Sequence, residues 1–228
     1  MLLRKANVVE GALALLEAEG LDGLTMRKLG AALNVQAGAL YRHFPSKEAL
    51  LDAMAEKLVD GIADPAPVGP WNEQITVLAH RFRAALLAHR DGARLYAGTF
   101  VQEPNINAAG SVAVEALCAE GISVERAGWI VFAGMYYVLG HTIEEQAQLR
   151  LVGRDDDWRA RADRSSPDHP LFAEALDSVI AADPADRFAY GLDLFIDGIR
   201  QHLPGTRQRA RRASSTRGRP RARPPSGS

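Results

Sequence analysis

The stretch that decides the fold is LTMRKLGAALNVQAGALYRHFPSK, residues 24–47. Thr25 stands where a helix N-cap is expected, Asn34 suits the left-handed geometry of a turn, and Pro45 ends a second helical run over 36–44. The apolar residues fall into two short helical runs separated by that turn: Leu24, Leu29, Leu33, Val35, Leu40 and Phe44. Two short helices at a steep angle form a helix-turn-helix, whose second helix can enter the major groove of DNA.

The residues on either side of this stretch predict two supporting helices. Residues 4–19 have an amphipathic pattern with Val9, Leu13 and Leu16 on one side, and Gly20 stops that helix. Ser46 is expected to cap a further helix that reaches about Asp64. The sequence therefore predicts an N-terminal three-helix helix-turn-helix domain over residues 1–63.

The remainder of the chain predicts a larger helical domain and a tail. Three prolines and a glycine in DPAPVGP, residues 64–70, break any helix and predict a linker. Ala and Leu dominate residues 71–203 and alternating β-branched residues are nearly absent, which indicates an all-α fold. The first helix should begin at Trp71 and end before Asp91, a polar loop should cover 153–169, and the other helices should cover 93–100, 107–121, 123–152, 170–181 and 184–203.

Charge is distributed unevenly along the chain although the net charge is only −1. Residues 204–228 contain eight arginines and no acidic residue, whereas 51–203 contain 23 acidic and 13 basic residues. The tail is rich in Arg, Pro, Ser and Gly with few apolar side chains, so we expect it to be disordered. Two interpretations stay open for the tail: sequence-independent binding of phosphates, or an extension without function.

Several classes of protein find no support in the sequence. The N-terminus lacks the features of a signal peptide, and no apolar run approaches the roughly 18 residues of a membrane span. There is no glycine-rich nucleotide loop, nucleophile elbow or zinc-ligand spacing. We therefore expect a cytoplasmic protein that is not an enzyme, with no cofactor and no metal site.

Three runs in the N-terminal region resemble one family: Thr25–Leu29 (TMRKL), Leu40–Phe44 (LYRHF) and Lys47–Leu51 (KEALL). They are similar to the DNA-binding domain of the TetR family of bacterial regulators. The segments HRDGAR (89–94), Gly98–Thr99 and GHTIEEQ (140–146) resemble the tetracycline-repressor branch of that family. The resemblance covers about residues 4–203. It implies a homodimeric regulator, most simply a repressor, that binds a palindromic double-stranded DNA operator and responds to a small-molecule effector.

The candidate DNA-contacting residues lie within the helix-turn-helix. The resemblance implies a base or phosphate contact for Arg27, and Gln36 can pair with an adenine edge. Small residues at Ala37, Gly38 and Ala39 would let the helix backbone approach the bases. For each polar residue a merely solvated surface is the alternative. The full set is Thr25, Arg27, Lys28, Gln36, Ala37, Gly38, Ala39, Tyr41, Arg42, His43 and Lys47.

The resemblance also implies an effector cavity in the C-terminal domain. Tyr96 stands where the tetracycline repressors have a histidine that ligates drug-bound magnesium, and Ala63 and Leu78 replace two further drug-contacting polar residues, whereas Thr99 and Glu144 match. Tyrosine is a poor ligand for a hard divalent ion. A largely apolar effector without a metal is therefore expected, although core packing is the alternative for each aromatic. The candidates are Phe82, Tyr96, Thr99, Phe100, Trp129, Phe132, Tyr136 and Glu144.

The two apolar helices near the C-terminus predict a dimer interface, because glycines would allow close approach: Gly128, Gly134, Gly140, Gly191 and Gly198. Two other functions remain as alternatives. One is an all-α enzyme that uses Tyr96, His141 and Glu144 for acid–base chemistry, and the other is a sequence-independent DNA-binding protein that relies on the tail. His141 with Glu144 or Glu145 has the spacing of a metal pair, but two ligands do not make a site.

Overall fold

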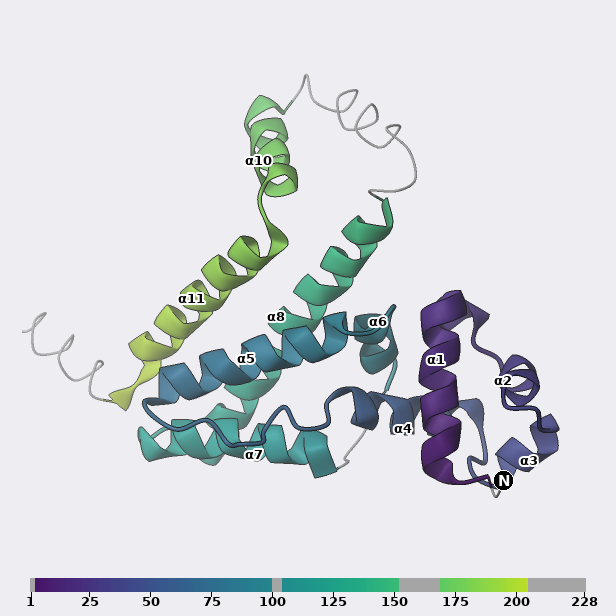
Figure 1. The fold of residues 1–228 in the computed structure, drawn as a ribbon. Helices are drawn as coiled ribbons and strands as arrows, with labels where there is room; N and C mark the ends of the chain where they lie inside the picture. Colours follow the sequence, from purple (N-terminus) through teal and green to yellow (C-terminus); the bar gives the residue numbers. More distant parts are fainter. Residues whose placement is uncertain (1–2, 100–103, 152–168, 205–228) are drawn as a thin grey trace, which may run out of the picture.

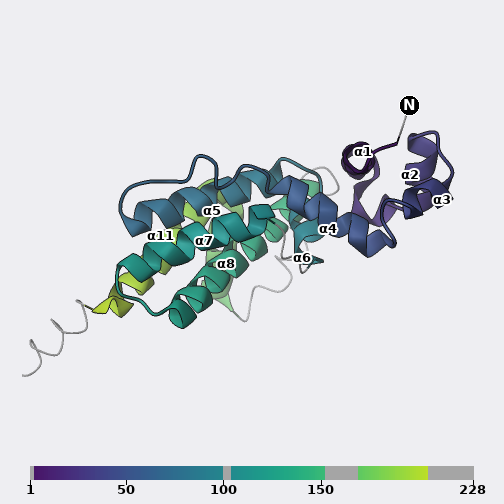
Figure 2. The same cartoon turned by 90° about the horizontal axis from the view of Figure 1, so that it is seen from below.

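The computed structural model describes residues 3–99, 104–151 and 169–204, and the regular structure within these ranges is helical throughout. The helices are α1 (Lys5–Gly23), α2 (Met26–Ala32), α3 (Ala37–Tyr41), α4 (Lys47–Leu58), α5 (Trp71–Leu87), α6 (Gly92–Ala97), α7 (Pro104–Ala119), α8 (Val124–Leu151), α10 (Pro170–Ala181) and α11 (Pro184–His202). The first three helices lie at one end of an elongated molecule, and α4 connects them to the larger body (Figures 1 and 2). The predicted all-α fold is confirmed.

Side-chain caps set the start of three helices where the sequence predicts them. The Thr25 hydroxyl accepts a hydrogen bond from Lys28 N at 3.2 Å, and the Ser46 hydroxyl accepts one from Ala49 N at the same distance. At the start of α11 the Asp183 carboxylate accepts from Ala185 N at 2.8 Å, and Pro184 occupies the first turn, where it loses no hydrogen bond. These bonds satisfy backbone N–H groups that have no partner within their own helix.

At the N-terminal end α1 packs against α2 and α4, α3 packs against α2, and their buried side chains belong to the apolar core that continues into the body. Val8 and Leu16 of α1, Leu29 of α2, Leu40 of α3 and Met54 of α4 are all 0% exposed. At roughly 1.5–3 kcal/mol for each fully buried side chain, this cluster holds two helices that are too short to be stable alone.

The body is built on the apolar stripe of α5, which packs against α7 and α8. Leu78, Phe82 and Leu86 of α5 are buried, and Phe188 and Leu192 of α11 are buried on the other side of the same core. The linker is tied to α5, because Arg81 Nη1 donates to Ile62 O at 3.1 Å and to Pro65 O at 2.8 Å.

Five predicted helix ends differ from the structure by three residues or more. α1 reaches Gly23 and does not stop before Gly20, although Gly20 has the non-helical φ of 74° and interrupts the helix there. The second helix of the helix-turn-helix covers only Ala37–Tyr41, because the chain tightens into a turn in which His43 N and Phe44 N both donate to Leu40 O. α4 stops at Leu58 and not near Asp64, since short turns follow and Gly61 adopts φ +75°. α6 ends at Ala97 and α7 begins at Pro104, where proline is compatible with a first turn.

α10 has no buried residue and stands apart from the core. It projects beyond the end of α11 (Figure 1). Among the described helices, none combines the length and apolarity that crossing a membrane requires. The predicted tail and most of the predicted loop over 153–169 lie outside the described residues.

Candidate DNA-binding surface and effector site

The turn between α2 and α3 depends on two residues with special backbone requirements. Asn34 has φ +54°, which is the left-handed geometry that the sequence predicts there. A Cβ placed on Gly30 would lie 2.9 Å from the carbonyl oxygen of Val35, so a larger residue would push the turn away from α2. Gly30 is a determinant of this turn that the sequence analysis missed.

Most of the candidate DNA-contacting residues are exposed to solvent. Exposed side chains belong to Thr25, Arg27, Lys28, Gln36, Tyr41 and Arg42, while Ala37, Ala39, His43 and Lys47 are half-buried. Gly38 faces open space, with no atom within 4 Å of a Cβ built on it. Lys28 forms an ion pair with Glu19 of α1. Gly38 is therefore an exposed position of α3 without a side chain, and the exposed residues Gln36, Tyr41 and Arg42 close to it in sequence carry hydrogen-bonding or cationic groups.

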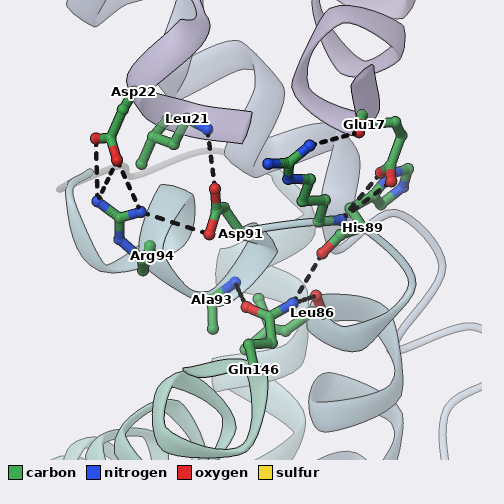
Figure 3. A network of polar contacts seen from close by, with 10 residues as sticks. Glu17, Leu21, Asp22, Leu86, His89, Asp91, Ala93, Arg94 and Gln146 are labelled. Carbon is green, nitrogen blue, oxygen red and sulfur yellow. Dashed lines mark hydrogen bonds and ion pairs between the residues drawn. The ribbon is translucent and has the colours of Figure 1, made fainter. Parts of the chain in front are cut away.

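A network of polar contacts joins this end of the molecule to the body (Figure 3). The Glu17 carboxylate of α1 accepts from Arg90 N at 3.1 Å and contacts His89 Nδ1 at 2.9 Å. Leu21 N donates to Asp91 Oδ2 at 2.9 Å, and Arg94 Nη2 pairs with Asp22 at 3.2 Å. The end of α1 is thus bound to the turn between α5 and α6.

Gln146 of α8 holds the other side of the same turn (Figure 3). Its amide nitrogen donates to Leu86 O at 3.1 Å and to His89 O at 2.8 Å, and its amide oxygen accepts from Ala93 N at 3.2 Å. Asp91, within this turn, adopts φ +55° and is only 5% exposed. The turn is therefore bound by α1 on one side, through Leu21 N, and by α8 on the other, through Gln146. A continuous set of contacts therefore runs from α8 through residues 88–94 to α1.

Three candidate effector-binding residues lie together in the body, where α4 packs against α6 and α7. The rings of Phe82 and Tyr96 meet edge to face with centroids 4.9 Å apart, and the Thr99 hydroxyl donates to Tyr96 O at 2.8 Å. Burial, with a smaller contribution from the charge of Glu56, raises the pKa of Tyr96 to about 12, so its phenol stays neutral at physiological pH. Leu78 is also buried, and Ala63 is half-buried.

Glu56 of α4 is a polar group in this region that sequence reasoning did not identify. Its Oε1 accepts from Asn105 N, near the start of α7, at 2.8 Å. Its Oε2 is buried and has no hydrogen-bond partner within the described ranges. No signal in the sequence sets Glu56 apart from other helical glutamates.

The other candidate effector-binding residues form a separate group. Trp129, Phe132 and Tyr136 are 66%, 49% and 62% exposed along one face of α8, and the last two rings are 6.2 Å apart. Glu144 is exposed, and Phe100 lies outside the described residues. The structure thus joins Phe82, Tyr96 and Thr99 by contacts that do not include the α8 aromatics.

The residues of the enzyme alternative do not form one cluster. Tyr96 packs on Phe82, while His141 faces the ring of Phe188 at 5.3 Å and Glu144 points to solvent. The potential metal partner of His141, Glu145, is engaged by Arg83, whose Nε donates to Glu145 Oε2 at 2.9 Å. In the described part of the chain, no group of three or more His, Cys, Asp and Glu side chains is arranged to hold a metal.

Comparison with known proteins agrees with this arrangement. Residues 8–54 match the family model described as bacterial regulatory proteins of the tetR family, and residues 64–203 match the tetracyclin repressor-like C-terminal domain. The tetracycline repressor protein class G of Vibrio anguillarum is 39% identical over 203 residues, which cover 86% of this chain and 93% of that protein.

Two solved structures have the same fold. A crystal structure described as a possible TetR family transcriptional regulator from Streptomyces coelicolor A3(2) is 42% identical with a TM-score of 0.79, and the alignment covers 86% of this chain and 98% of that one. The crystal structure of BioQ with its double-stranded DNA operator is 30% identical with a TM-score of 0.65, and the alignment covers 86% of this chain and 98% of that one.

Proposed function

Since the chain belongs to the TetR family of bacterial regulatory proteins, we propose that it is a repressor released from a palindromic operator by a small, largely apolar effector. The family consists of ligand-responsive transcriptional repressors that act as dimers, and the chain is such a regulator. In this proposal residues 1–63 bind DNA, 64–70 form the linker, and 71–203 bind the effector and dimerise. The protein acts in the cytoplasm, where the DNA is, and it is not an enzyme.

The observation that carries the proposal is the line of contacts between the two functional ends. Gln146 of α8 fixes the turn before α6, Asp91 and Glu17 fix that turn to α1, and α1 supports α2 and α3. Tyr96 lies on α6, directly after this turn. An effector that displaces α6 therefore changes the support of α1 and shifts the equilibrium between the operator-binding and released states.

In this function α3 enters the major groove. Gln36 and Arg27 contact bases or phosphates, and the small residues Ala37, Gly38 and Ala39 let the backbone of α3 lie close to the base edges. Thr25, Lys28, Tyr41, Arg42, His43 and Lys47 bind phosphates, which sets the register on the duplex without reading its sequence.

The exposed apolar side chains of α8 and α11 support a homodimer. Trp129 and Tyr136 on α8 and Tyr190 and Leu194 on α11 are each more than half exposed in the single chain, which is unusual for large apolar residues. Three glycines on the same two helices face open space and leave room for a partner helix: Gly128, Gly140 and Gly198. Gly134 and Gly191 instead accommodate Phe195 and Tyr137 of the same chain. A second copy of the chain can cover these faces with the same faces of its own α8 and α11. The resulting dimer presents two helix-turn-helix domains to a two-fold operator.

The effector site of this proposal is the region around Phe82, Tyr96 and Thr99, next to the buried Oε2 of Glu56. Phe82 offers an apolar ring there, and Tyr96 offers a neutral hydroxyl at the position where the tetracycline repressors have a metal-binding histidine. Glu144 is assigned to the same site because it matches the tetracycline-repressor branch, and Phe100 because it is an aromatic residue next to Thr99 in the sequence. Trp129, Phe132 and Tyr136 are exposed on α8 in the single chain, so they reach an effector only where dimerisation brings that face of α8 to the site.

The experiment that tests the function is capture of genomic DNA fragments by the purified full-length protein, followed by footprinting of the bound fragments. A repressor of this kind protects one short palindrome, and extracts that contain the effector release it. Uniform protection of every fragment would instead support the sequence-independent DNA-binding alternative. A variant with Gln36→Ala is the matched control, because it removes one reading group and leaves the phosphate contacts in place.

A further inference from the structure

The C-terminal end of α1 carries three acidic side chains: Glu17, Glu19 and Asp22. Glu17 and Asp22 contact the body, one at the turn before α6 and the other at α6 itself (Figure 3). Glu19 instead forms an ion pair with Lys28 of α2, inside the helix-turn-helix. The pair of Glu19 and Lys28 is therefore internal to the DNA-binding end and separate from the line of contacts to the body.

The backbone on both sides holds the two partners of this pair in place. Lys28 lies in the first turn of α2, where its N–H donates to the capping hydroxyl of Thr25 at 3.2 Å. Glu19 directly precedes Gly20, whose φ of +74° interrupts α1. A Cβ placed on Gly23 would lie 2.6 Å from Glu19 Cβ and 3.2 Å from Glu19 Oε2. The absence of a side chain at Gly23 thus leaves the space that Glu19 occupies.

Water reaches both partners, because 44% of the Lys28 side chain and 39% of the Glu19 side chain are exposed. An ion pair between groups this exposed contributes little to stability, so a competing anion can take over the ammonium group. The other cationic candidates for DNA contact, Arg27, Arg42 and Lys47, form no ion pair with an acidic side chain in the ranges that the structure describes. Glu19 therefore neutralises a charge that would otherwise be available to a phosphate.

A phosphate that contacts Lys28 has to compete with the Glu19 carboxylate, because both are anionic acceptors for the same N–H donors. The carboxylate also repels the phosphate, which has the same sign of charge. We propose that Glu19 is a built-in competitor of DNA phosphate for Lys28, and that it lowers the affinity of the protein for DNA of any sequence. The inference rests on the proposed DNA binding and adds to it a residue that opposes sequence-independent binding. Base contacts then provide a larger share of the affinity for the operator.

The test measures binding of the full-length protein to a random-sequence duplex at several salt concentrations. We expect Glu19→Gln to bind this duplex more tightly at low salt and to steepen the salt slope by about 0.9 for each DNA-binding domain on the duplex, since Lys28 then neutralises a phosphate. For one contact, the gain in affinity should shrink roughly three- to fourfold between about 50 and 200 mM salt. In the Lys28→Ala background, Glu19→Gln should change neither quantity, because no ammonium group is set free.

Glu10→Gln is the matched control, because Glu10 is an exposed acidic residue of the same helix and the variant makes the same change in net charge. It should bind the duplex with the slope of the unaltered chain. Glu19→Ala removes the same carboxylate and serves if Glu19→Gln does not fold.

Two results would overturn the proposal while the chain still binds DNA. One is an equal gain from Glu19→Gln with and without Lys28, which would mean that the carboxylate acts only through the overall charge. The other is an unchanged affinity and salt slope in Glu19→Gln, which would mean that Lys28 does not meet a phosphate. Failure of the unaltered chain and of Glu19→Gln alike to bind any DNA would instead refute the proposed function, and this inference with it.

Discussion

Replacing Gln146 with leucine should destabilise the fold through the turn that joins its two ends. Leucine has a similar size, so the main loss is three hydrogen bonds of a side chain that is 8% exposed. His89 O keeps its bond from Gly92 N, whereas Leu86 O and Ala93 N lose the partner that Gln146 provides. A buried backbone group left unsatisfied costs about 1–3 kcal/mol, so two of them predict a loss of roughly 2–6 kcal/mol in the free energy of unfolding.

The measurement is thermal and urea unfolding at one fixed protein concentration, because dimerisation makes the midpoint depend on concentration. A chain of this size loses about 2–4 °C in Tm per kcal/mol, so a shift of roughly 4–24 °C is expected. Gln74→Leu is the matched control, since Gln74 makes one exposed hydrogen bond, to Gly69 O at 2.7 Å, and its loss should change little. If Gln146→Leu unfolds within 1 °C of the control, the turn does not depend on α8 and the proposed line of contacts is refuted.

The other predictions concern DNA, the effector and pH. Arg27→Ala and Gln36→Ala should each weaken operator binding by about 1–3 kcal/mol, whereas Lys47→Ala should weaken binding to all sequences alike; an unchanged sequence preference in Gln36→Ala would rule out α3 as the reader. Deleting residues 207–228 should leave folding and dimerisation intact, and each tail–phosphate contact should contribute about 0.9 to the salt slope of binding, so equal slopes would mean that the tail does not touch DNA. Tetracycline with magnesium should not release the operator, because buried polar groups of the drug would lack partners at about 1–3 kcal/mol each; tight, magnesium-dependent release in a gel-shift titration would contradict this. The folded-state pKa of Tyr96 is about 12, against 10.0 for the ordinary side chain. The stability linked to its neutral form is therefore fully present below pH 10 and is lost as the pH rises through 12. Tyr96→Phe should lose less stability over that pH range, as measured by urea unfolding.

The parts of the fold that sequence predicted well are those that depend on near neighbours along the chain. Thr25, Ser46 and Asp183 accept bonds from N–H groups two or three residues away, so the signal and the partner share one short segment. Asn34 adopts left-handed geometry as a property of its own backbone. For the same reason the helix-turn-helix and the all-α class follow from residue type and spacing.

The helix ends were less accurate because side-chain preference leaves several stopping points within one turn. α4 ends at Leu58 although Ile62 is buried in register with it, since the chain reaches Ile62 through short turns and not through a further helical turn. Tyr96 and Trp129 were both candidates for one site from the sequence, with core packing as the alternative, whereas in the single chain Tyr96 is buried and Trp129 is 66% exposed. Which face of α8 is covered depends on helices distant in sequence, and helical periodicity alone does not identify it.

The sequence by itself therefore determined that this chain forms a helix-turn-helix on a helical body, because hydrogen bonds within a helix and apolar spacing are local. Only the tertiary structure decided how the two ends are joined. Leu21 and Asp91 are 70 positions apart, Gln146 and Leu86 are 60 apart, and Arg187 meets Gln148 across 39. No local pattern distinguishes these polar side chains from solvated ones on any helix. Their partners are fixed only when α1, α5, α8 and α11 pack together and remove the water that would otherwise satisfy them.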